Sequence, residues 1–393
     1  MRKIVLLPKK EESILRFHPW IFSGAIKKIE GTPEEGDVVE VFAADGRFLA
    51  VGHYQVGSIA VRILSFQPAV IGKDFWRQSI LQAFSLRTSL CLAGHPDNNT
   101  YRLIHGEGDG LPGLIIDIYG KTAVMQAHSV GMHLARKELA EVLAEVLGGN
   151  LANIYYKSET TLPYKANLEA ENGYLLGGAQ VEHVALENGL KFYVDWEKGQ
   201  KTGFFVDQRD NRSLLEQYAK GKRVLNMFCY TGGFSFYALR GGATAVHSVD
   251  SSSKAIDITC QNVELNFPGD TRHEAFAEDA FKYLERMGDQ YDLIVLDPPA
   301  FAKHKNVLRN ALQGYRKLNN IAFEKIKPGG IIFTFSCSQV VSKIDFRLAV
   351  FSAAAQSGRK VRILHQLTQP ADHPVNIYHP EGEYLKGLVL HVE

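Results

Sequence analysis

The alternation of strand-like and helix-like segments that begins near residue 190 constrains the fold of this chain more than any other feature. Five runs of apolar residues carry the strand pattern: 224–228, 245–249, one near 275, 292–296 and 331–335. A helical pattern separates each run from the next, and such alternation is typical of a parallel sheet with helices on both faces. We therefore predict that residues 190–393 form a doubly wound, Rossmann-like α/β sheet.

The residues before this region lack the alternation. Residues 1–70 contain short strand-like runs, with Asp45-Gly46 as a hairpin signal, and predict a small all-β domain. Residues 73–185 combine helical apolar spacing with strand-like runs and predict a central α+β domain. The expected domains are thus 1–70, 73–185 and 190–393.

The charge balance excludes some classes of protein. The chain carries 44 Lys and Arg against 43 Asp and Glu, a net charge of +1, and 45% of its residues are hydrophobic. A mainly disordered chain and a polycationic nucleic-acid binder are therefore excluded, whereas a protein with a locally basic surface is not. No apolar run approaches the roughly 18 residues of a membrane span, so we expect no membrane partner.

The cysteines indicate a reducing environment. Four cysteines in 393 residues, Cys91, Cys229, Cys260 and Cys337, do not form a disulfide framework. None belongs to a CxxC pair, so we expect no metal site. A cytoplasmic location is the simplest expectation, with each thiol either a small buried side chain or a reactive group.

Candidate ligand-binding residues follow four of the predicted strands. They are Tyr230-Thr231-Gly232-Gly233 after the first strand, Asp250 after the second, Asp279 after the third and Asp297 after the fourth. Ligands of doubly wound sheets bind beyond the carboxyl ends of the strands, so these residues are expected to share one site. The two glycines let the backbone approach a ligand closely, and Asp250 is suitably spaced to accept hydrogen bonds from ribose hydroxyls.

Two features favour S-adenosylmethionine over a dinucleotide as the ligand. The turn NMFCYTGGFS lacks the G-x-G-x-x-G pattern that seats a pyrophosphate, and S-adenosylmethionine has no phosphate to seat. Asp297 is followed by two prolines, which continue neither a sheet nor a helix and so fix the chain at the mouth of the site. A dinucleotide-dependent oxidoreductase is accordingly the least favoured enzyme class.

These motifs resemble those of a known family. NMFCYTGGFS, Asp250, Glu278-Asp279 and LDPPAF are similar to the motifs of class I S-adenosylmethionine-dependent methyltransferases. Nearly the whole chain resembles the bacterial RlmI-like 23S rRNA cytosine-5 methyltransferases. HPWIFSGAI and DGRFLAVGHY are similar to the PUA domain of that family, GEGDGLPGLIIDIYG to its central domain, and KGQKTGFFVDQRDNR to the segment that enters its catalytic domain.

The resemblance implies a set of cofactor contacts. Asp250 would hold the ribose and Asp279 the adenine amine. The other implied contacts come from Thr202, Asp207, Arg209, Asn226, Phe228, Tyr230, Thr231 and Gly232. Arg209 could pair with the methionine carboxylate, although an exposed surface arginine is the simpler interpretation of that residue alone.

The implied target, carbon-5 of cytosine, is a poor nucleophile and requires covalent catalysis. A thiolate that adds to carbon-6 lets carbon-5 take the methyl group, after which a base removes the carbon-5 proton and the thiolate leaves. Cys337 follows the strand at 331–335 in the context FSCS, which resembles the nucleophile motif of the family, and is predicted to be that thiolate. Asp297 is predicted to hydrogen-bond N3 or the exocyclic amine of the base. The other three cysteines are interpreted as structural.

One departure from the family leaves a second target open. Many RNA cytosine-5 methyltransferases carry a second cysteine in the fourth-strand motif, where this chain has Asp-Pro-Pro-Ala-Phe. That motif is more familiar in nitrogen methyltransferases, so guanine N7 or an exocyclic amine is the alternative target, with Phe301 stacked on the base. A non-catalytic RNA-binding ribosome-assembly factor is the alternative from another class. The intact acids, glycines and cysteine argue against it.

A basic stretch without acids follows Asp297. Five basic residues and no acid lie between Asp297 and Glu324. We predict that RNA contacts this stretch through phosphates and stacked bases, with a solvated helix face as the alternative interpretation. The predicted RNA-binding residues are Phe301, Lys303, Lys305, Arg309, Tyr315, Arg316 and Lys317. The expected partner is 23S rRNA or a large-subunit precursor rather than DNA, and a homodimer is left open.

Overall fold

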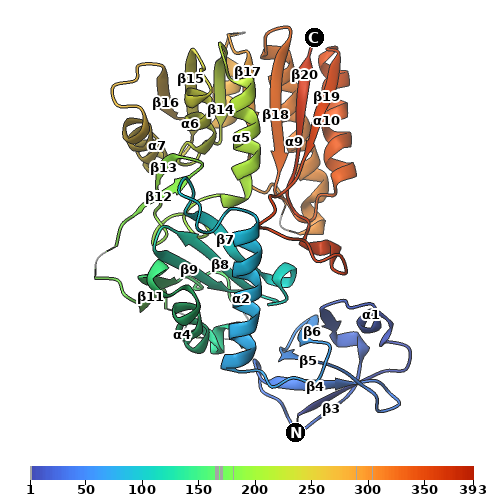
Figure 1. Ribbon diagram of the computed structural model, residues 1–393. Helices are drawn as coiled ribbons and strands as arrows, with labels where there is room; N and C mark the ends of the chain where they lie inside the picture. Colours follow the sequence, from blue (N-terminus) through green and yellow to red (C-terminus); the bar gives the residue numbers. More distant parts are fainter. Residues whose placement is uncertain (1, 164–167, 169–170, 180, 289, 303) are drawn as a thin grey trace. The chain divides into compact units, whose positions relative to one another are not determined.

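The computed structural model describes residues 2–163, 168, 171–179, 181–288, 290–302 and 304–393 (Figure 1). By its internal contacts the chain divides into two compact units. Unit 1 comprises Met1–Gly189, Val194–Val206 and Ala371–Gly382, and unit 2 comprises Leu190–Tyr193, Asp207–Pro370 and Glu383–Glu393. The three domain boundaries expected from the sequence stay a prediction.

Unit 1 begins with a six-stranded sheet. Its elements are β1 (Lys3–Leu6), α1 (Glu12–Leu15), β2 (Trp20–Phe22), η1 (Ser23–Ala25), β3 (Ile26–Glu30), β4 (Val38–Phe42), β5 (Phe48–Tyr54) and β6 (Ile59–Ser65). The strand order is β2-β6-β5-β4-β1-β3, and only the β1–β4 pair is parallel among the described strands of this sheet. Val39 and Val41 alternate into a core with Ile4 and Leu6, as the two-residue period of a strand requires. The predicted β architecture of this part is confirmed.

A five-stranded sheet with helices follows in unit 1. Its elements are α2 (Lys73–Ser89), β7 (Thr100–His105), η2 (Gly106–Asp109), β8 (Leu114–Tyr119), β9 (Thr122–Ala127), α3 (Val130–Leu134), α4 (Arg136–Leu147), η3 (Gly148–Asn150), β10 (Asn153–Tyr156), β11 (Gly173–Leu176), β12 (Val184–Glu187) and, later in the chain, η7 (Pro380–Gly382). The strand order is β11-β10-β9-β8-β7. Trp76 and Ile80 of α2 are buried in one core with Leu139 and Leu143 of α4, because residues four apart share a helix face. The predicted α+β architecture is confirmed.

Unit 2 is built on a seven-stranded sheet. Its elements are β13 (Leu190–Tyr193), η5 (Val206–Gln208), α5 (Arg209–Tyr218), β14 (Arg223–Met227), α6 (Gly233–Arg240), β15 (Ala245–Asp250), α7 (Ser253–Asn266), β16 (His273–Ala277), α8 (Ala280–Arg286), β17 (Leu293–Leu296), η6 (Lys305–Val307), α9 (Leu308–Lys325), β18 (Gly330–Ser336), α10 (Lys343–Ser357), β19 (Val361–Leu367) and β20 (Lys386–Val392). The strand order is β16-β15-β14-β17-β18-β20-β19. Helices α5, α6 and α7 pack in series, as do α8, α9 and α10, which gives the two helical layers of a doubly wound fold (Figure 1).

The sheet of unit 2 differs from an all-parallel sheet at one edge. The five strands from β16 to β18 are parallel, whereas β20 runs antiparallel to both β18 and β19. The parallel arrangement expected for the five predicted strands is therefore confirmed, and the sequence analysis did not predict β19 and β20. Between β19 and β20 the described chain contains the short 3-10 helix η7 but no α-helix, and without a crossover α-helix consecutive strands pair antiparallel.

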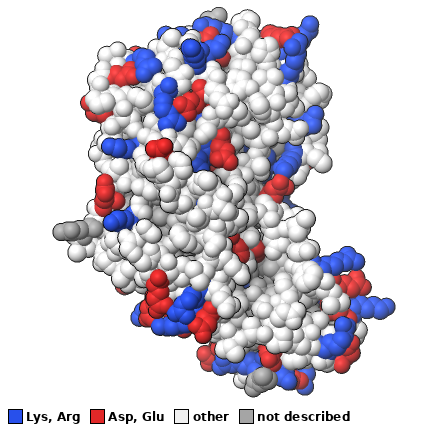
Figure 2. Space-filling model, in the orientation of Figure 1, with Lys and Arg blue, Asp and Glu red and all other residues white. Residues whose placement is uncertain are grey.

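The surface carries mixed charges. Figure 2 shows Lys and Arg side chains interspersed with Asp and Glu over the face in view, as the near-zero net charge leads one to expect. In the part of the chain that the structure describes, no helix is both long and apolar enough to cross a membrane.

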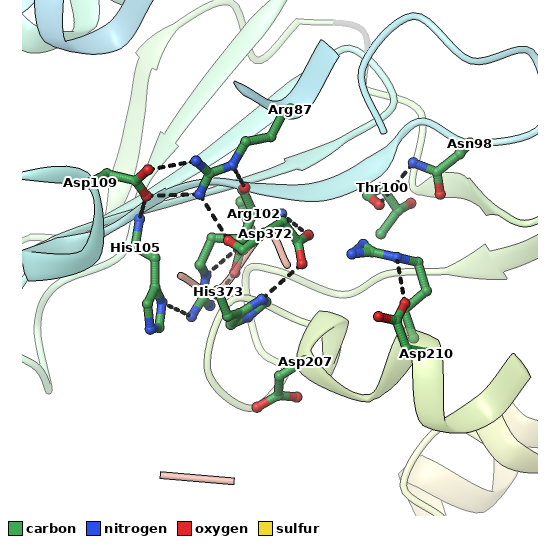
Figure 3. Close-up of polar contacts among 12 residues, drawn as sticks. Arg87, Asn98, Thr100, Arg102, His105, Asp109, Asp207, Asp210, Asp372 and His373 are labelled. Atoms are coloured by element: carbon green, nitrogen blue, oxygen red, sulfur yellow. Dashed lines mark hydrogen bonds and ion pairs between the residues drawn. The ribbon is translucent and has the colours of Figure 1, made fainter. Parts of the chain in front are cut away.

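A buried ion-pair network lies in unit 1 (Figure 3). Arg87 has no exposed surface, and its guanidinium donates to both carboxylate oxygens of Asp109 at 2.5 and 2.8 Å and to the carbonyl of Asp372 at 2.8 Å. The Asp372 carboxylate accepts the backbone N–H of Arg102 at 2.9 Å, and the Arg102 guanidinium pairs with buried Asp117. Buried charges are tolerated only when they are paired. The network thus anchors residues 371–382 to the rest of unit 1.

Candidate active site

The carboxyl ends of four parallel strands lie side by side in unit 2. The register pairs Met227 of β14 with Val249 of β15 and with Leu296 of β17, and Leu296 in turn with Thr334 of β18. The residues that end or follow these strands therefore share one edge of the sheet. They are the loop 228–232, Asp250, Asp297 and Cys337. This is the edge at which doubly wound sheets bind ligands.

The loop after β14 has a strained backbone. The φ angle is +57° at Phe228, +49° at Tyr230 and +87° at Gly232, and residues other than glycine rarely adopt such values. A Cβ atom on Gly232 would lie 2.6 Å from Cγ2 of Thr259, so only glycine fits there. The backbone N–H of Tyr230 donates to the Asp250 carboxylate at 3.0 Å and helps to hold this conformation. Strain of this kind concentrates at ligand sites.

Asp250 is half-buried, and its carboxylate holds backbone N–H groups at the carboxyl edge of the sheet. Besides Tyr230, its carboxylate accepts the backbone N–H of Ser252 at 2.9 Å. Each carboxylate oxygen has two lone pairs, so each oxygen has one left for a ribose hydroxyl. The geometry is compatible with the predicted contact, which stays a prediction.

Two buried oxygens beside the same loop have no hydrogen-bond partner among the described residues. They are Oδ1 of Asn226 and Oγ1 of Thr231, in side chains 1% and 2% exposed. Leaving a buried acceptor unpaired costs about 1–3 kcal/mol, so each such atom in a native structure requires an explanation. A ligand that carries amine or hydroxyl hydrogens would satisfy both oxygens. The methionine and ribose parts of S-adenosylmethionine carry such hydrogens, so the residues present fit that molecule.

Asp207 and Arg209 are buried at the start of α5, with exposed fractions of 5% and 2%. Oδ2 of Asp207 accepts the hydroxyl of Tyr384 at 2.7 Å, and Nε of Arg209 lies 3.9 Å from Oδ1 of Asp210. The interpretation of Arg209 as an exposed surface arginine is therefore wrong. Its pairing with a methionine carboxylate stays a prediction.

Thr202 and Asp279, which are also predicted to contact the cofactor, form hydrogen bonds within the protein. Thr202 belongs to unit 1, where its hydroxyl donates to Asp117 at 2.6 Å and hydrogen-bonds the hydroxyl of Tyr119 at 2.8 Å. Asp279 is exposed and caps α8 by accepting the backbone N–H of Lys282 at 3.0 Å. Their contacts with the cofactor stay predictions.

The loops after β17 and β18 are fastened together around Cys337. The buried hydroxyl of Ser338 hydrogen-bonds the carbonyl of Ala302 and accepts its backbone N–H. The hydroxyl of Ser336 donates to that of Tyr315 at 2.9 Å. Cys337 lies between the two serines and is half-buried, so its thiol is not sealed in the core.

The hydroxyl of Tyr315 is bonded to Ser336, the residue before Cys337. Burial raises the pKa of Tyr315 to about 12, and negative charge on Cys337 and on Asp297 contributes to that rise. The register of β17 and β18 pairs Leu296 with Thr334, so Asp297 and Cys337 follow neighbouring strands at the same edge of the sheet. Their catalytic roles stay predictions.

Lys386 belongs to the same edge and was not singled out in the sequence analysis. It is 6% exposed, and its Nζ donates to the carbonyls of Ser338 at 2.6 Å and Tyr384 at 2.8 Å. Burial lowers the pKa of Lys386 to about 8. The available signal was one lysine inside an apolar strand, in the sequence YLKGLVLHV.

The other cysteines differ from Cys337. Cys229 is buried in the loop after β14, and burial, followed by the charge of Asp250, raises the pKa of its thiol well above the ordinary value. Cys91 and Cys260 are exposed, and their interpretation as structural rather than catalytic cysteines stays a prediction. Neither lies on a loop at the carboxyl edge of the sheet, since Cys91 follows α2 and Cys260 lies within α7.

The predicted RNA-binding residues fall into separate groups. Lys305 and, on α9, Arg309 and Arg316 are exposed, and among the described residues no acidic side chain lies within 4 Å of their charged nitrogens. Lys317 is also exposed but pairs with Glu285 at 3.2 Å. Lys303 lies outside the described residues.

The two predicted aromatic contacts also separate. Tyr315 is fully buried, so its predicted role as a surface for base stacking is wrong, because the helical spacing of α9 turns the ring into the core. Phe301 is half-buried, and its ring centroid lies 4.7 Å from that of Tyr315. Gly314 makes room for the Phe301 ring, which would lie 3.0 Å from a Cβ at that position.

Among the described residues, no group of three or more His, Cys, Asp and Glu side chains is arranged to hold a metal ion. The reactive groups described at the carboxyl edge of the sheet are the thiol of Cys337, the carboxylates of Asp250 and Asp297, and the amine of Lys386.

Comparison with known proteins supplies the family. The profile of the S-adenosylmethionine-dependent methyltransferases matches residues 161–382, and that of the PUA-like domain matches residues 4–66. The chain is 41% identical over 398 residues to the Ribosomal RNA large subunit methyltransferase I of Aeromonas hydrophila, and 41% identical over 397 residues to that of Aeromonas salmonicida. Both alignments cover 98% of each chain.

A solved structure shares the fold. SMU.776, a provisionally assigned methyltransferase complexed with SAH (S-adenosylhomocysteine), has a TM-score of 0.85 and 24% identity, with 100% of both chains covered. Together with the family profiles, this match confirms the predicted fold class, and the profiles confirm S-adenosylmethionine as the cofactor.

Proposed function

From the premise that this chain belongs to the S-adenosylmethionine-dependent methyltransferases named Ribosomal RNA large subunit methyltransferase I, we propose that it methylates carbon-5 of a cytosine in 23S rRNA. The reaction proceeds through a covalent adduct between Cys337 and carbon-6 of the base. The observation that carries the proposal is the half-buried thiol of Cys337 at the end of β18, with Asp297 at the end of the neighbouring strand β17.

The residues at the end of β14 hold the cofactor in this proposal. Asn226 and Thr231 offer buried oxygens without partners, and Asp250 retains lone pairs for the ribose. Arg209 and Asp207, whose carboxylate accepts the hydroxyl of Tyr384, supply further cofactor contacts in this proposal. When bound, S-adenosylmethionine supplies a methyl group on a sulfonium sulfur, which the activated carbon-5 takes.

The residues at the ends of β17 and β18 act on the base. The Cys337 thiolate adds to carbon-6, and its electron pair forms the S–C6 bond. The electrons of the carbon-5–carbon-6 double bond move to form a carbon-4–carbon-5 double bond, and those of the carbon-4–N3 double bond move to N3, which gives an enamine with a nucleophilic carbon-5. Asp297 hydrogen-bonds N3 or the exocyclic amine and stabilises the charge that develops on the ring. After methylation a base, water in the simplest case, takes the carbon-5 proton. The electron pair of that C–H bond restores the double bond and expels the thiolate.

The RNA is held in part by the exposed cations of the segment after Asp297. Lys305, Arg309 and Arg316 have no acidic neighbour within 4 Å among the described residues, so they are available to phosphates. The target base must be unpaired or flipped out of a duplex to reach Cys337.

A nitrogen methyltransferase acting on rRNA is the second candidate. It is favoured by Asp297-Pro298-Pro299 and by Phe301, which is half-buried on the same loop and could stack on a purine. In this reaction an amine or ring nitrogen attacks the methyl group directly, and Cys337 takes no part.

The product nucleoside decides between these functions. The purified chain is incubated with methyl-labelled S-adenosylmethionine and 23S rRNA transcribed without modifications, and the digested RNA is analysed by nucleoside mass spectrometry. We expect 5-methylcytosine. Methylated guanosine or an N-methyl nucleoside would support the nitrogen target. If the RNA carries no labelled methyl group although the chain still binds it, the result would support a non-catalytic ribosome-assembly factor.

A further inference from the structure

Lys386 lies directly across the sheet from the residue that precedes the candidate nucleophile. The antiparallel register of β18 and β20 pairs Ser336 with Lys386, so the two side chains point to the same face of the sheet. The Lys386 side chain reaches past this pair to the carbonyl of Ser338, at 2.6 Å from Nζ. Its ammonium group is therefore anchored to the peptide segment that contains Cys337.

This lysine is buried where lysines seldom are. Only 6% of it is exposed, and an ammonium group out of water must be compensated by hydrogen bonds or by an anion. Among the described residues, the carbonyls of Ser338 and Tyr384 accept two of its three N–H donors. Two neutral carbonyls compensate a full charge incompletely. An anion close to Nζ would complete the site.

The position of Lys386 points to the thiolate of Cys337 as that anion, because Lys386 pairs with Ser336 in the sheet and binds the carbonyl of Ser338, the two residues that flank Cys337. Burial lowers the pKa of Lys386, and the largest opposing influence is the negative charge of a Cys337 thiolate, followed by that of Glu383. Glu383 is paired with Lys343 of α10, which itself lowers the pKa of Lys386 slightly. Other elements bring the hydroxyl of Tyr315 on α9, which accepts from Ser336, and the carboxylate of Asp297, which follows the neighbouring strand β17, to this edge. Neither is a cation, whereas Lys386 holds its Nζ against the carbonyl of Ser338, the residue next to Cys337.

We propose that Lys386 is a positioning residue that keeps Cys337 in its thiolate form, as an ammonium–thiolate pair held by the carbonyls of Ser338 and Tyr384. This inference rests on the proposed function, since it gives the role of Lys386 in the covalent step of that reaction. It also links the two sides of the site, because Tyr384 donates its hydroxyl to Asp207 at 2.7 Å.

The proton and electron balance of the pair is simple. When Lys386 is neutral, formation of the pair transfers one proton from Sγ of Cys337 to Nζ of Lys386; when Lys386 is already an ammonium group, the thiol proton passes to water. In both cases the S–H bond breaks and its electron pair stays on sulfur. That electron pair forms the bond to carbon-6 of cytosine. When the adduct collapses, the S–C6 bond breaks, the electron pair returns to sulfur, and the thiolate is again stabilised by the ammonium group.

The test measures the thiol itself and needs no methyl transfer. Cys91 and Cys260 are exposed and are replaced by serine, which leaves Cys337 and the buried Cys229. The rate at which iodoacetamide alkylates the Cys337 peptide is followed by mass spectrometry from about pH 5.5 to about pH 9.5, a window around the ordinary thiol pKa. The variants are Lys386→Met, which keeps the shape without the charge, Lys386→Arg, which keeps the charge, and Lys343→Met, which removes another lysine of unit 2.

Lys386→Met is expected to raise the apparent pKa of the Cys337 thiol by about one unit and to slow alkylation at pH 7 about 10-fold. Lys386→Arg should restore most of the rate, and Lys343→Met should change it less than about 2-fold. Binding of S-adenosylhomocysteine by each variant shows that unit 2 is folded. If Lys386→Met does not bind it, Lys386→Gln provides the same measurement.

An unchanged pH profile in Lys386→Met, or equal slowing in Lys386→Met and Lys386→Arg, would overturn the proposal and leave Lys386 a structural hydrogen-bond donor. These results are independent of the product nucleoside. A chain that makes no 5-methylcytosine but shows the lysine-dependent thiol contradicts the proposed function alone. A chain that makes 5-methylcytosine with a lysine-independent thiol contradicts only the role of Lys386.

Discussion

The carboxyl edge of the sheet of unit 2 carries one cysteine after β14 and another after β18, each with an aspartate on the same edge. The surroundings of the two thiols differ. After β14, the thiol of Cys229 lies under a strained loop, near the carboxylate of Asp250. After β18, Cys337 is half-buried, with Asp297 after the neighbouring strand β17 and Lys386 bound to the carbonyl of Ser338. Both cysteines lie within two residues of the end of a parallel strand of this sheet.

The difference shows that a cysteine at a strand end is not by itself a nucleophile. Removal from water disfavours the thiolate, and the nearby Asp250 disfavours it further, so the pKa of Cys229 is raised. Partial exposure and a neighbouring cation act in the opposite direction at the other end of the edge. The β14 end is thus suited to hold a cofactor, and the β18 end to perform chemistry.

The largest expected effect separates the two thiols. Cys337→Ala should lower formation of the methylated nucleoside at least ~10³-fold, because it removes the atom that bonds to the base. Cys229→Ala should leave the rate within about 3-fold and cost about 1 kcal/mol of stability through lost packing. Initial rates by nucleoside mass spectrometry and urea unfolding measure the two quantities. Full activity of Cys337→Ala would contradict covalent catalysis and favour the nitrogen target.

The two carboxylates should separate rate from affinity. Asp297→Asn should lower the rate ~10²- to 10⁴-fold with little change in the affinity for S-adenosylhomocysteine, since it acts on the base. Asp250→Asn should weaken that affinity ~10- to 100-fold, because it weakens charge-assisted bonds to the ribose and to the backbone of Tyr230. Calorimetry with S-adenosylhomocysteine and single-turnover rates distinguish them. Equal loss of affinity in both variants would mean that the two ends do not divide their roles in this way.

The buried lysine at the β18 end should make stability depend on pH. The pKa of Lys386 is about 8 in the folded chain against 10.5 for an ordinary lysine. Between these values the unfolded chain binds more protons, so the stability contributed by this position rises with pH. Urea unfolding of a Cys337→Ala chain and of the same chain with Lys386→Met should show the lysine form gaining about 2 kcal/mol, relative to the methionine form, between pH 7 and about pH 9.5. A difference that stays constant with pH would mean that Lys386 keeps an ordinary pKa.

The smallest expected effect is on RNA binding by the exposed cations of the segment that follows Asp297. Lys305→Gln and Arg309→Gln should each weaken RNA binding and reduce the slope of log affinity against log salt by about 0.7, the value for one contact with single-stranded RNA. Lys317→Gln is the matched control, because its ammonium is already paired with Glu285. Filter binding at several salt concentrations measures the slopes. Equal slopes in all three variants would place the RNA elsewhere on the chain.

Much of the fold, and the positions of the predicted cofactor residues at the carboxyl edge of the sheet, followed from local sequence patterns. Strand and helix periodicity predicted the five strands that lead to the site, and the glycine turn with Asp250 located the loop after β14. Cys337 and Asp297 were predicted as a pair because both follow strands of one parallel sheet. Such inferences succeed because periodicity and strand ends are properties of consecutive residues.

The sequence by itself thus determined the doubly wound sheet, the family and the residues at its ligand-binding edge. The tertiary structure alone decided which of them are buried, paired or exposed. It turned Tyr315 into the core, exposed Cys91 and Cys260, and placed Lys386 against the carbonyl of Ser338, 48 residues away. The reason is physical: burial and pKa depend on all atoms nearby in space, and residues remote in the sequence supply most of them.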